Sequence, residues 1–156
     1  MNNIKLDSFI LEKMNLKDKD HLLLIKKFEF DNDVRKYNYP YSGSFYNLVT
    51  SNGYTDDIFN SFFVIKYEDR IIGYLEIEKS KEVYLNYALL KEERGKGLGP
   101  KVLKELSDYL LREYRDSIDK IDIIVDNKNK PSLKATIKSG FEEVENLNGF
   151  TTYRKR

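Results

Sequence analysis

A chain of 156 residues with 40% apolar and 13% aromatic side chains can bury the core of one domain, which excludes wholesale disorder. The 27 basic and 26 acidic residues leave a net charge of only +1, whereas a dedicated nucleic-acid binder normally carries a basic surplus. The chain has no cysteine and one histidine, His21, so disulfides, thiolate metal sites, a cysteine nucleophile and multi-histidine metal sites are excluded.

The sequence also bears on location and partners. No apolar run approaches the roughly 20 residues that a membrane-spanning helix needs. Residues 1–7 lack the apolar stretch of a signal peptide. We therefore expect a cytoplasmic protein, built as a single domain over residues 1–156, with neither a membrane nor a nucleic acid among its partners.

The first half of the chain predicts one strand, two helices and the loops between them. Leu22, Ile25 and Phe28 belong to an apolar stripe with helical spacing, which predicts the longer of the two helices. The predicted elements are a strand over Phe9–Met14, a helix over Asp18–Phe30 that ends at residues 31–33, a tyrosine-rich loop over 37–43, a short helix over Phe45–Thr50 and a turn at Asn52-Gly53.

The patterning is clearer in the second half of the chain. Glu68-Asp69-Arg70 separates two β-rich runs and predicts a hairpin, and Gly140 is placed to end a helix. The predicted elements are strands over Ser61–Tyr67, Ile71–Glu78 and Val83–Leu90, a helix over Gly99–Tyr114, a strand over Ile121–Val125, a helix over Pro131–Lys138 and a strand over Phe150–Arg154. Their order, β-β-β-α-β-α-β, indicates helices that connect strands of a mixed sheet.

A glycine-rich segment, Arg94-Gly95-Lys96-Gly97-Leu98-Gly99, lies between a predicted strand and a predicted helix. The N-terminus of a helix carries unpaired N–H groups and partial positive charge, and glycines let a ligand approach the backbone closely. Arg94 and Lys96 add full charges suited to a diphosphate. The spacing is neither that of a Walker loop nor that of a Rossmann fingerprint. A tight turn that binds nothing is the alternative.

Two motifs in the second half together resemble one family. Arg94-x-x-Gly97-x-Gly99 resembles the acyl-CoA pyrophosphate signature of the GCN5-related N-acetyltransferases (GNAT). Asn129-Lys130-Pro131-Ser132, followed by residues 138–141, is similar to that family's Asn-x-x-Ser/Ala … Gly-Phe segment. The resemblance extends from Phe9 to the C-terminus and implies an α/β (α+β) fold: a mixed, mostly antiparallel central sheet of about six or seven strands flanked by about four helices.

The resemblance also implies acetyl-CoA as the cofactor, with no metal. Backbone amides from Arg94 to Gly99 would hold the pyrophosphate, the strand end near Leu89 and Leu90 would pair with the pantetheine arm, and Asn129 would bind that arm. Lys130 would lie near the nucleotide phosphates, whereas Ser132 either binds cofactor or caps a helix. The implied cofactor-binding residues are Leu89, Leu90, Arg94, Gly95, Lys96, Gly97, Leu98, Gly99, Asn129, Lys130 and Ser132.

Transfer of an acyl group to an amine needs a proton acceptor, because most amines are cationic at neutral pH. Glu76 and Glu78 share one face of a predicted strand, and Glu76 is the candidate base; the alternative is that both are solvated. A backbone N–H at the end of the Val83–Leu90 strand is a candidate for stabilising the developing oxyanion.

The sequence departs from the family where catalysis is concerned. Thr136 stands where many members carry a tyrosine as general acid, and Ile124 stands where ribosomal-alanine acetyltransferases carry a glutamate. Tyr87 and, second, Tyr84 are candidates for the missing acid, with packing as the alternative role. Four tyrosines could line an acceptor pocket or simply pack on the core: Tyr37, Tyr39, Tyr41 and Tyr46.

We therefore expect an N-acetyltransferase that passes an acetyl group from acetyl-CoA to a primary amine of a small molecule, a peptide or a protein N-terminus. Its partner is that amine acceptor, with a homodimer left open. A non-catalytic acyl-CoA-binding module is the alternative, motivated by Thr136 and Ile124. A third reading, a nucleic-acid or ribosome-associated protein with a basic face of Lys128, Lys130, Lys134 and Lys138, conflicts with the balanced charge.

Overall fold

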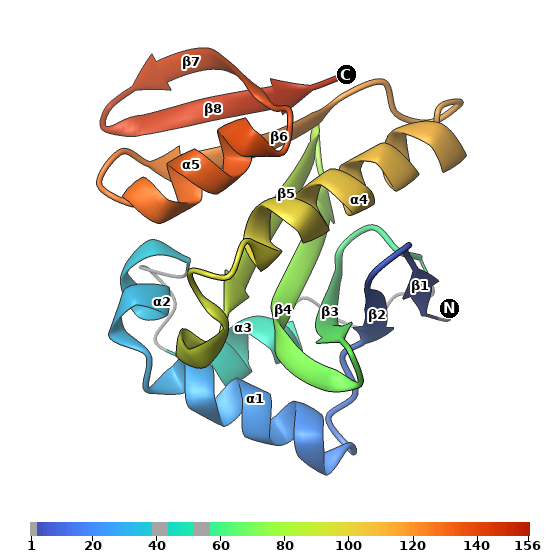
Figure 1. Ribbon diagram of the computed structural model, residues 1–156, viewed down its shortest axis with the longest axis vertical. Helices are drawn as coiled ribbons and strands as arrows, with labels where there is room; N and C mark the ends of the chain where they lie inside the picture. Colours follow the sequence, from blue (N-terminus) through green and yellow to red (C-terminus); the bar gives the residue numbers. More distant parts are fainter. Residues whose placement is uncertain (1–2, 39–43, 52–56) are drawn as a thin grey trace.

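The computed structural model describes residues 3–38, 44–51 and 57–156, which form one sheet with helices on both faces (Figure 1). The described strands lie in the order β1-β2-β3-β4-β5-β6-β8-β7. Every neighbouring pair is antiparallel except β5 and β6, which are parallel. The strands are β1 (Ile4–Lys5), β2 (Ile10–Lys13), β3 (Ser61–Tyr67), β4 (Arg70–Lys79), β5 (Val83–Leu89), β6 (Ile121–Asp126), β7 (Glu142–Leu147) and β8 (Phe150–Lys155).

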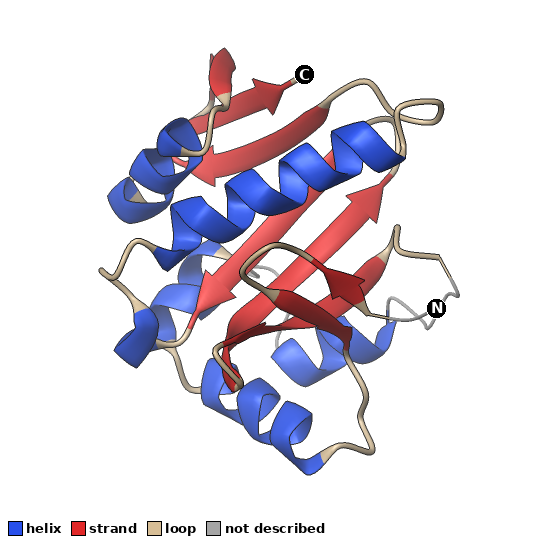
Figure 2. Ribbon diagram, turned by 45° about the vertical axis from the view of Figure 1, so that its right-hand side comes forward, coloured by secondary structure: helices blue, strands red, loops and turns tan. Residues whose placement is uncertain are grey.

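Helices cover both faces of the sheet. The longest, α4, runs across one face with α5 beside it, while α1 and α3 lie under the opposite face (Figure 2). The helices are α1 (Lys19–Glu29), α2 (Asn32–Tyr37), α3 (Phe45–Ser51), α4 (Leu98–Glu113) and α5 (Lys130–Lys138), and a 3₁₀ turn, η1 (Lys91–Glu93), precedes α4.

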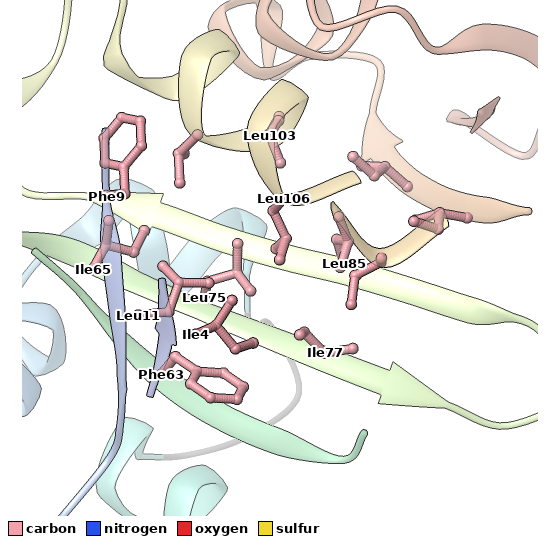
Figure 3. Close-up of a cluster of buried hydrophobic side chains, with 14 of the residues drawn as sticks. Ile4, Phe9, Leu11, Phe63, Ile65, Leu75, Ile77, Leu85, Leu103 and Leu106 are labelled. Atoms are coloured by element: carbon pink, nitrogen blue, oxygen red, sulfur yellow. The ribbon is translucent and has the colours of Figure 1, made fainter. Parts of the chain in front are cut away.

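The larger core cluster lies between α4 and the sheet. Leu103 and Leu106 project from α4 onto Leu75 of β4 and Leu85 of β5 (Figure 3). Leu75, Leu103 and Leu106 are fully buried. Burying each such side chain contributes about 1.5–3 kcal/mol, so the three- and four-residue spacing of apolar positions on α4 fixes which face it turns to the sheet.

A second core cluster fills the space between the sheet and α1–α3, and its centre is aromatic. The Tyr74 ring of β4 lies 5.2 Å from the Phe28 ring of α1 and 4.7 Å from the Phe45 ring of α3, measured between centroids. Phe62 of β3 packs against Phe45 edge-on. Because Leu75 and Tyr74 point to opposite faces, β4 is covered on both sides, which explains why its central residues are almost all buried.

The predicted mixed, mostly antiparallel sheet is confirmed, and each predicted element agrees with the structure to within one residue at either end. The predicted hairpin closes through Glu68 and Asp69, with φ of 50° and 63°, as a type I′ turn requires at both central positions. The Asn52-Gly53 turn, Tyr39 and Tyr41 lie outside the described residues.

The structure contains more elements than the sequence predicts: the described residues form eight strands rather than six or seven, and five α-helices rather than about four. Residues 31–33 do not lead into a loop, because the Asp31 carboxylate caps a second helix, α2. β1 has only two residues, and β7 is exposed throughout, so neither carries the apolar alternation by which strands are recognised.

Candidate functional site

A cavity of about 640 Å³ opens where β5 and β6 separate. Among the described residues these two strands pair at a single position, Tyr84 with Asp122. Asp122 also accepts two hydrogen bonds from the Arg154 guanidinium, at 2.7 and 2.9 Å, which ties β6 to β8 at the closed end of the gap. The walls of the cavity come from β5, β6, α2, the glycine segment 94–99 and the start of α5.

The edge of β5 that faces this cavity presents main-chain groups. The Leu90 N–H donates to a carbonyl of β4 at 2.8 Å, and because main-chain groups alternate in direction along a strand, those of Tyr87 and Leu89 point away from β4 into the gap. Asn38 Nδ2 donates to the Tyr87 carbonyl at 2.7 Å, and Arg94 Nε donates to the Leu89 carbonyl at 3.0 Å. The N–H groups of Tyr87 and Leu89 are therefore directed into the cavity.

The glycine segment lies at one end of the cavity and opens α4. Gly95 and Gly97 have φ of 76° and 78°, the left-handed region that favours glycine, and nothing lies within 4 Å of the position that a Cβ would take at either residue. Leu98 and Gly99 form the first turn of α4, whose N–H groups have no intrahelical partner. This backbone is therefore open to an anion, as the sequence predicts for a phosphate site.

The two cations of the glycine segment are both engaged with carboxylates. Arg94 Nη2 lies 2.6 Å from Asp31 Oδ2, and Lys96 Nζ lies 3.2 Å from Glu93 Oε1. Lys128, Lys134 and Lys138, by contrast, line the cavity and form no ion pair within the described part of the chain. Free positive charge at the site therefore comes from α5 and the turn before it.

The Asn129–Ser132 motif starts α5 at the rim of the cavity. Asn129 and Ser132 line the cavity, whereas Lys130 does not. Asn129 is the residue before the helix, and its side chain makes no capping bond. Ser132 lies in the first turn, where its hydroxyl contacts the Tyr87 hydroxyl rather than capping the helix.

Arg70 anchors the segment that leads into the glycines. Its guanidinium makes two hydrogen bonds to the buried Glu93 carboxylate, at 2.8 and 3.0 Å, and thereby joins the β3–β4 hairpin to η1. The hydrogen bonds from Arg70, opposed by burial and assisted by Lys96, lower the pKa of Glu93 from its ordinary 4.5 to about 2. Glu93 directly precedes Arg94, so this ion pair fixes where the glycine segment begins.

This ion pair predicts a pH dependence of stability. Because the pKa of Glu93 is depressed in the folded state, its stabilising contribution is complete above about pH 4.5 and is lost as the pH falls toward about 2. Glu93→Gln should therefore melt below the wild type at pH 7, and the difference in Tm should shrink below about pH 4.5 and close only as the pH falls to about 2 and below, as measured by thermal unfolding. Glu68→Gln, which alters the exposed second partner of Arg70, is the matched control. Parallel Tm–pH curves for Glu93→Gln and wild type would contradict this assignment.

Tyr87 is the aromatic side chain of β5 that lines the cavity. Its hydroxyl lies 3.3 Å from the position of a Cβ at Gly99, beside the first turn of α4. Burial raises the pKa of Tyr87 to about 12, against the opposing effect of its hydrogen bond with Ser132. Thr136 is fully buried, and its hydroxyl donates to the Ser132 carbonyl at 2.7 Å, so this side chain is used within its own helix.

Glu76 lies behind the residues that line the cavity. Its side chain is 8% exposed, so the expectation that both strand glutamates are solvated is wrong for Glu76, whereas Glu78 is exposed. Glu76 pairs across the sheet with Asn86, which does line the cavity. Directly opposed side chains on neighbouring strands lie about 5 Å apart at Cβ, so Glu76 sits one side chain behind the wall.

The remaining residues that the sequence analysis names differ in whether they line the cavity. Ile124 and Tyr37 line the cavity, and Tyr84 lies at its closed end. Tyr46 does not line this cavity; it is exposed and lies beside residues of α1 in a separate hollow. Asn38, whose amide binds both the Asn86 side chain and the Tyr87 carbonyl, is a cavity residue that sequence reasoning missed. A lone asparagine after a six-residue helix carries no pattern that could have revealed it.

Comparison with known proteins agrees with this geometry. The sequence model described as the acetyltransferase (GNAT) family matches residues 26–141, which include the cavity walls and the glycine segment. The chain belongs to the GNAT acetyltransferase family. No curated protein sequence matches this GNAT chain significantly.

Solved structures resemble this GNAT domain over nearly its whole length. A GNAT-family acetyltransferase from Bacillus anthracis is 17% identical, with a TM-score of 0.74, and the match covers 97% of this chain and 95% of that one. A ribosomal alpha-N-protein acetyltransferase in complex with coenzyme A is 19% identical, with a TM-score of 0.70 and coverage of 99% and 97%. The Vibrio cholerae spermidine N-acetyltransferase, in complex with coenzyme A and spermine, is 18% identical, with a TM-score of 0.69 and coverage of 94% and 93%.

None of the helices in the described ranges is both long enough and apolar enough to traverse a lipid bilayer.

Proposed function

We propose that this one-domain GNAT protein is an N-acetyltransferase that uses acetyl-CoA to acetylate a primary amine. The observation that carries the proposal is the cavity between the separated strands β5 and β6, which ends at the open glycine backbone of α4. A site of this shape suits a long ligand with a diphosphate at one end. The coenzyme-bound state of two similar structures supports the same assignment.

The residues present fit each part of the cofactor. Main-chain N–H groups of residues 95–99 would hold the diphosphate, assisted by the unpaired lysines Lys128, Lys134 and Lys138. Asn129 would bind the pantetheine arm at the start of α5. One of the N–H groups of Leu89 and Tyr87 would pair with an amide of that arm, much as a strand adds to a sheet edge, which leaves the other for the acyl group. The bound cofactor supplies an acyl thioester, and it would lie beside Tyr87.

A main-chain N–H and a carboxylate of the chain would assist the transfer. An N–H of the open β5 edge, at Tyr87 or Leu89, would donate to the carbonyl oxygen as negative charge develops on it. Glu76 would accept the amine proton through water at Asn86, since its carboxylate lies behind that residue. The amine nitrogen forms the new bond to the acyl carbon as the carbon–sulfur bond breaks.

Tyr87 would stabilise the departing thiolate. With its pKa raised to about 12, the phenol keeps its proton at neutral pH and can donate a hydrogen bond. A thiol has a pKa of about 8.5, so complete proton transfer from this phenol would run uphill, and the thiolate proton would instead come from solvent. The role is thus hydrogen-bond donation, which Thr136 at the usual family position is not placed to provide.

Calorimetric titration with acetyl-CoA tests the proposal first, followed by assay of thiol release with spermine, lysine and a peptide with a free N-terminus. We expect binding and amine-dependent thiol release. Undetectable binding at millimolar acetyl-CoA would reject the proposal. Tight binding without release by any amine would favour the non-catalytic acyl-CoA-binding module. Polyamines and protein N-termini belong in the panel because similar structures are named for such acceptors.

Conservative substitutions test the two catalytic roles. Glu76→Gln should lower kcat by roughly 100-fold or more, because proton acceptors typically contribute that much. Tyr87→Phe should lower kcat by about 100-fold or more, as loss of one preorganised donor does, with little change in the KM for acetyl-CoA. Glu78→Gln and Tyr84→Phe, on the same two strands but outside the cavity, are the controls. Equal kcat values for a variant and its control would remove that residue from the mechanism.

A further inference from the structure

α2 is fastened at its N-terminal end to the segment that carries the glycines. Asp31 Oδ1 caps the helix by accepting the N–H groups of Asp33 and Val34, at 3.1 and 3.3 Å. The other oxygen of the same carboxylate, Oδ2, lies 2.6 Å from Arg94 Nη2. Asp31 and Arg94 are 63 residues apart in sequence, so this ion pair is a tertiary contact rather than a local one.

The C-terminal end of α2 is fastened to the edge of β5 that faces the cavity. Asn38, directly after the helix, donates from Nδ2 to the Tyr87 carbonyl at 2.7 Å and to the Asn86 side chain at 2.9 Å. Arg94 in turn donates from Nε to the Leu89 carbonyl. The Tyr87 and Leu89 carbonyls, which point away from β4, are therefore both bound by side chains that also hold α2.

The Arg94 guanidinium is held against β5 and the start of α2. Its Nε binds a carbonyl, its Nη2 binds Asp31, and its Nη1 lies 3.8 Å from Asp33. Asp31 is 7% exposed, so withdrawing Arg94 toward a phosphate would leave a buried carboxylate without its cation. Such uncompensated burial is strongly unfavourable. Lys128, Lys134 and Lys138 line the cavity without any such constraint.

We propose that Arg94 is a positioning residue that holds α2 against the open edge of β5, and that it does not bind the cofactor phosphates. α2 contributes Asp33, Val34 and Tyr37 to the cavity wall, so the Asp31–Arg94 pair sets the shape of the cavity on this side. The inference rests on the proposed function, since it assigns the glycine backbone and the lysines to the cofactor and α2 to the wall that Arg94 holds in place.

Arg94→Gln and Asp31→Asn test the inference, because each removes one charge of the pair while asparagine retains the ability to cap a helix. Two quantities should be measured on the full chain: the Kd for coenzyme A by calorimetry, and hydrogen exchange of the α2 amides from Arg35 to Asn38. Arg94→Lys is the conservative variant, and Arg112→Gln, at an exposed end of α4, is the charge-matched control.

We expect both charge-removing variants to speed exchange in α2 about tenfold or more, with core strands unchanged and the Kd for coenzyme A within about threefold of wild type. Because the two residues act as one contact, the double variant should exchange no faster than the faster single variant, and Arg94→Lys should restore part of the protection. A tenfold or larger rise in Kd for Arg94→Gln, or α2 exchange at the wild-type rate, would overturn the proposal. Failure of the wild type to bind coenzyme A would reject the proposed function instead, and the exchange data would still decide the role of the ion pair.

Discussion

Replacing Gly97 with aspartate is expected to weaken acetyl-CoA binding by at least roughly 100-fold while leaving the protein folded. Gly97 directly precedes α4 at φ of 78°, and no atom lies within 4 Å of the position that a Cβ would take. A carboxylate placed there would share the proposed diphosphate site. Two unit charges 4 Å apart repel by about 4 kcal/mol at the effective dielectric of a protein surface, which exceeds the ~2.7 kcal/mol of a 100-fold change.

The fold should tolerate this substitution. Asparagine and aspartate adopt the left-handed conformation more readily than other residues with side chains. Negative charge at the N-terminus of a helix is mildly stabilising, by about 0.3–1 kcal/mol. Gly97→Asp should therefore melt close to the wild type, so that a loss of binding reports on the site and not on stability.

Gly97→Asn is the matched control, because it adds the same atoms without the charge. We expect its Kd for acetyl-CoA, measured by calorimetry, to rise much less than that of Gly97→Asp, and the gap between the two variants to narrow as salt screens the repulsion. Equal affinities for the two variants would show that no anion binds at this turn, and the proposed cofactor orientation would be wrong.

The sequence predicts the elements whose signals are local. The glycine segment is recognisable because left-handed dihedrals at Gly95 and Gly97 demand glycine within a few residues of a helix start. The α4 helix is recognisable by its apolar spacing, and the β3–β4 hairpin by the polar residues between two β-rich runs. In each case the residues that determine the structure are neighbours along the chain.

The α2 side of the cavity depends on contacts between residues that are far apart in the sequence. Asp31 meets Arg94 across 63 residues, and Asn38 meets Tyr87 across 49. Arg94 illustrates the consequence, because its charge alone predicts a phosphate ligand, and its ion pair with the buried Asp31 is evident only in the fold. Glu76 is a similar case: alternation places it on the face of the exposed Glu78, and its own burial becomes evident only in the folded structure.

β7 was missed although a local signal exists. Asn148 and Gly149 have φ of 55° and 86°, and Asn-Gly is the strongest short signal for a type I′ hairpin turn. The strand before the turn is exposed along its whole length and contains Glu142, Glu143 and Glu145, so its composition opposes a strand assignment. Here the turn chemistry was the better predictor than the strand's own residues.

Gly73→Ala is expected to have the largest effect on stability. A Cβ at this position of β4 would lie 2.2 Å from the Ala88 carbonyl oxygen and 3.0 Å from the Leu89 Cα. Both are backbone atoms of β5, so neither a side-chain rotation nor a smaller side chain on β5 would relieve the clash. Overpacking a core costs about 1–3 kcal/mol when side chains can shift, and a backbone clash exceeds that range.

We therefore expect Gly73→Ala to lower Tm by about 10 °C or more, since 1 kcal/mol shifts a domain of this size by about 2–4 °C. Gly149→Ala is the control: its Cβ would meet nothing within 4 Å, so only the left-handed backbone, at about 1–2 kcal/mol, opposes it. Because β5 must move away from β4 to admit the methyl group, it would move toward β6 and narrow the cavity. Any folded Gly73→Ala protein should thus bind acetyl-CoA more weakly than Gly149→Ala; a variant that melts and binds like the control would mean that β5 is not held where the structure places it.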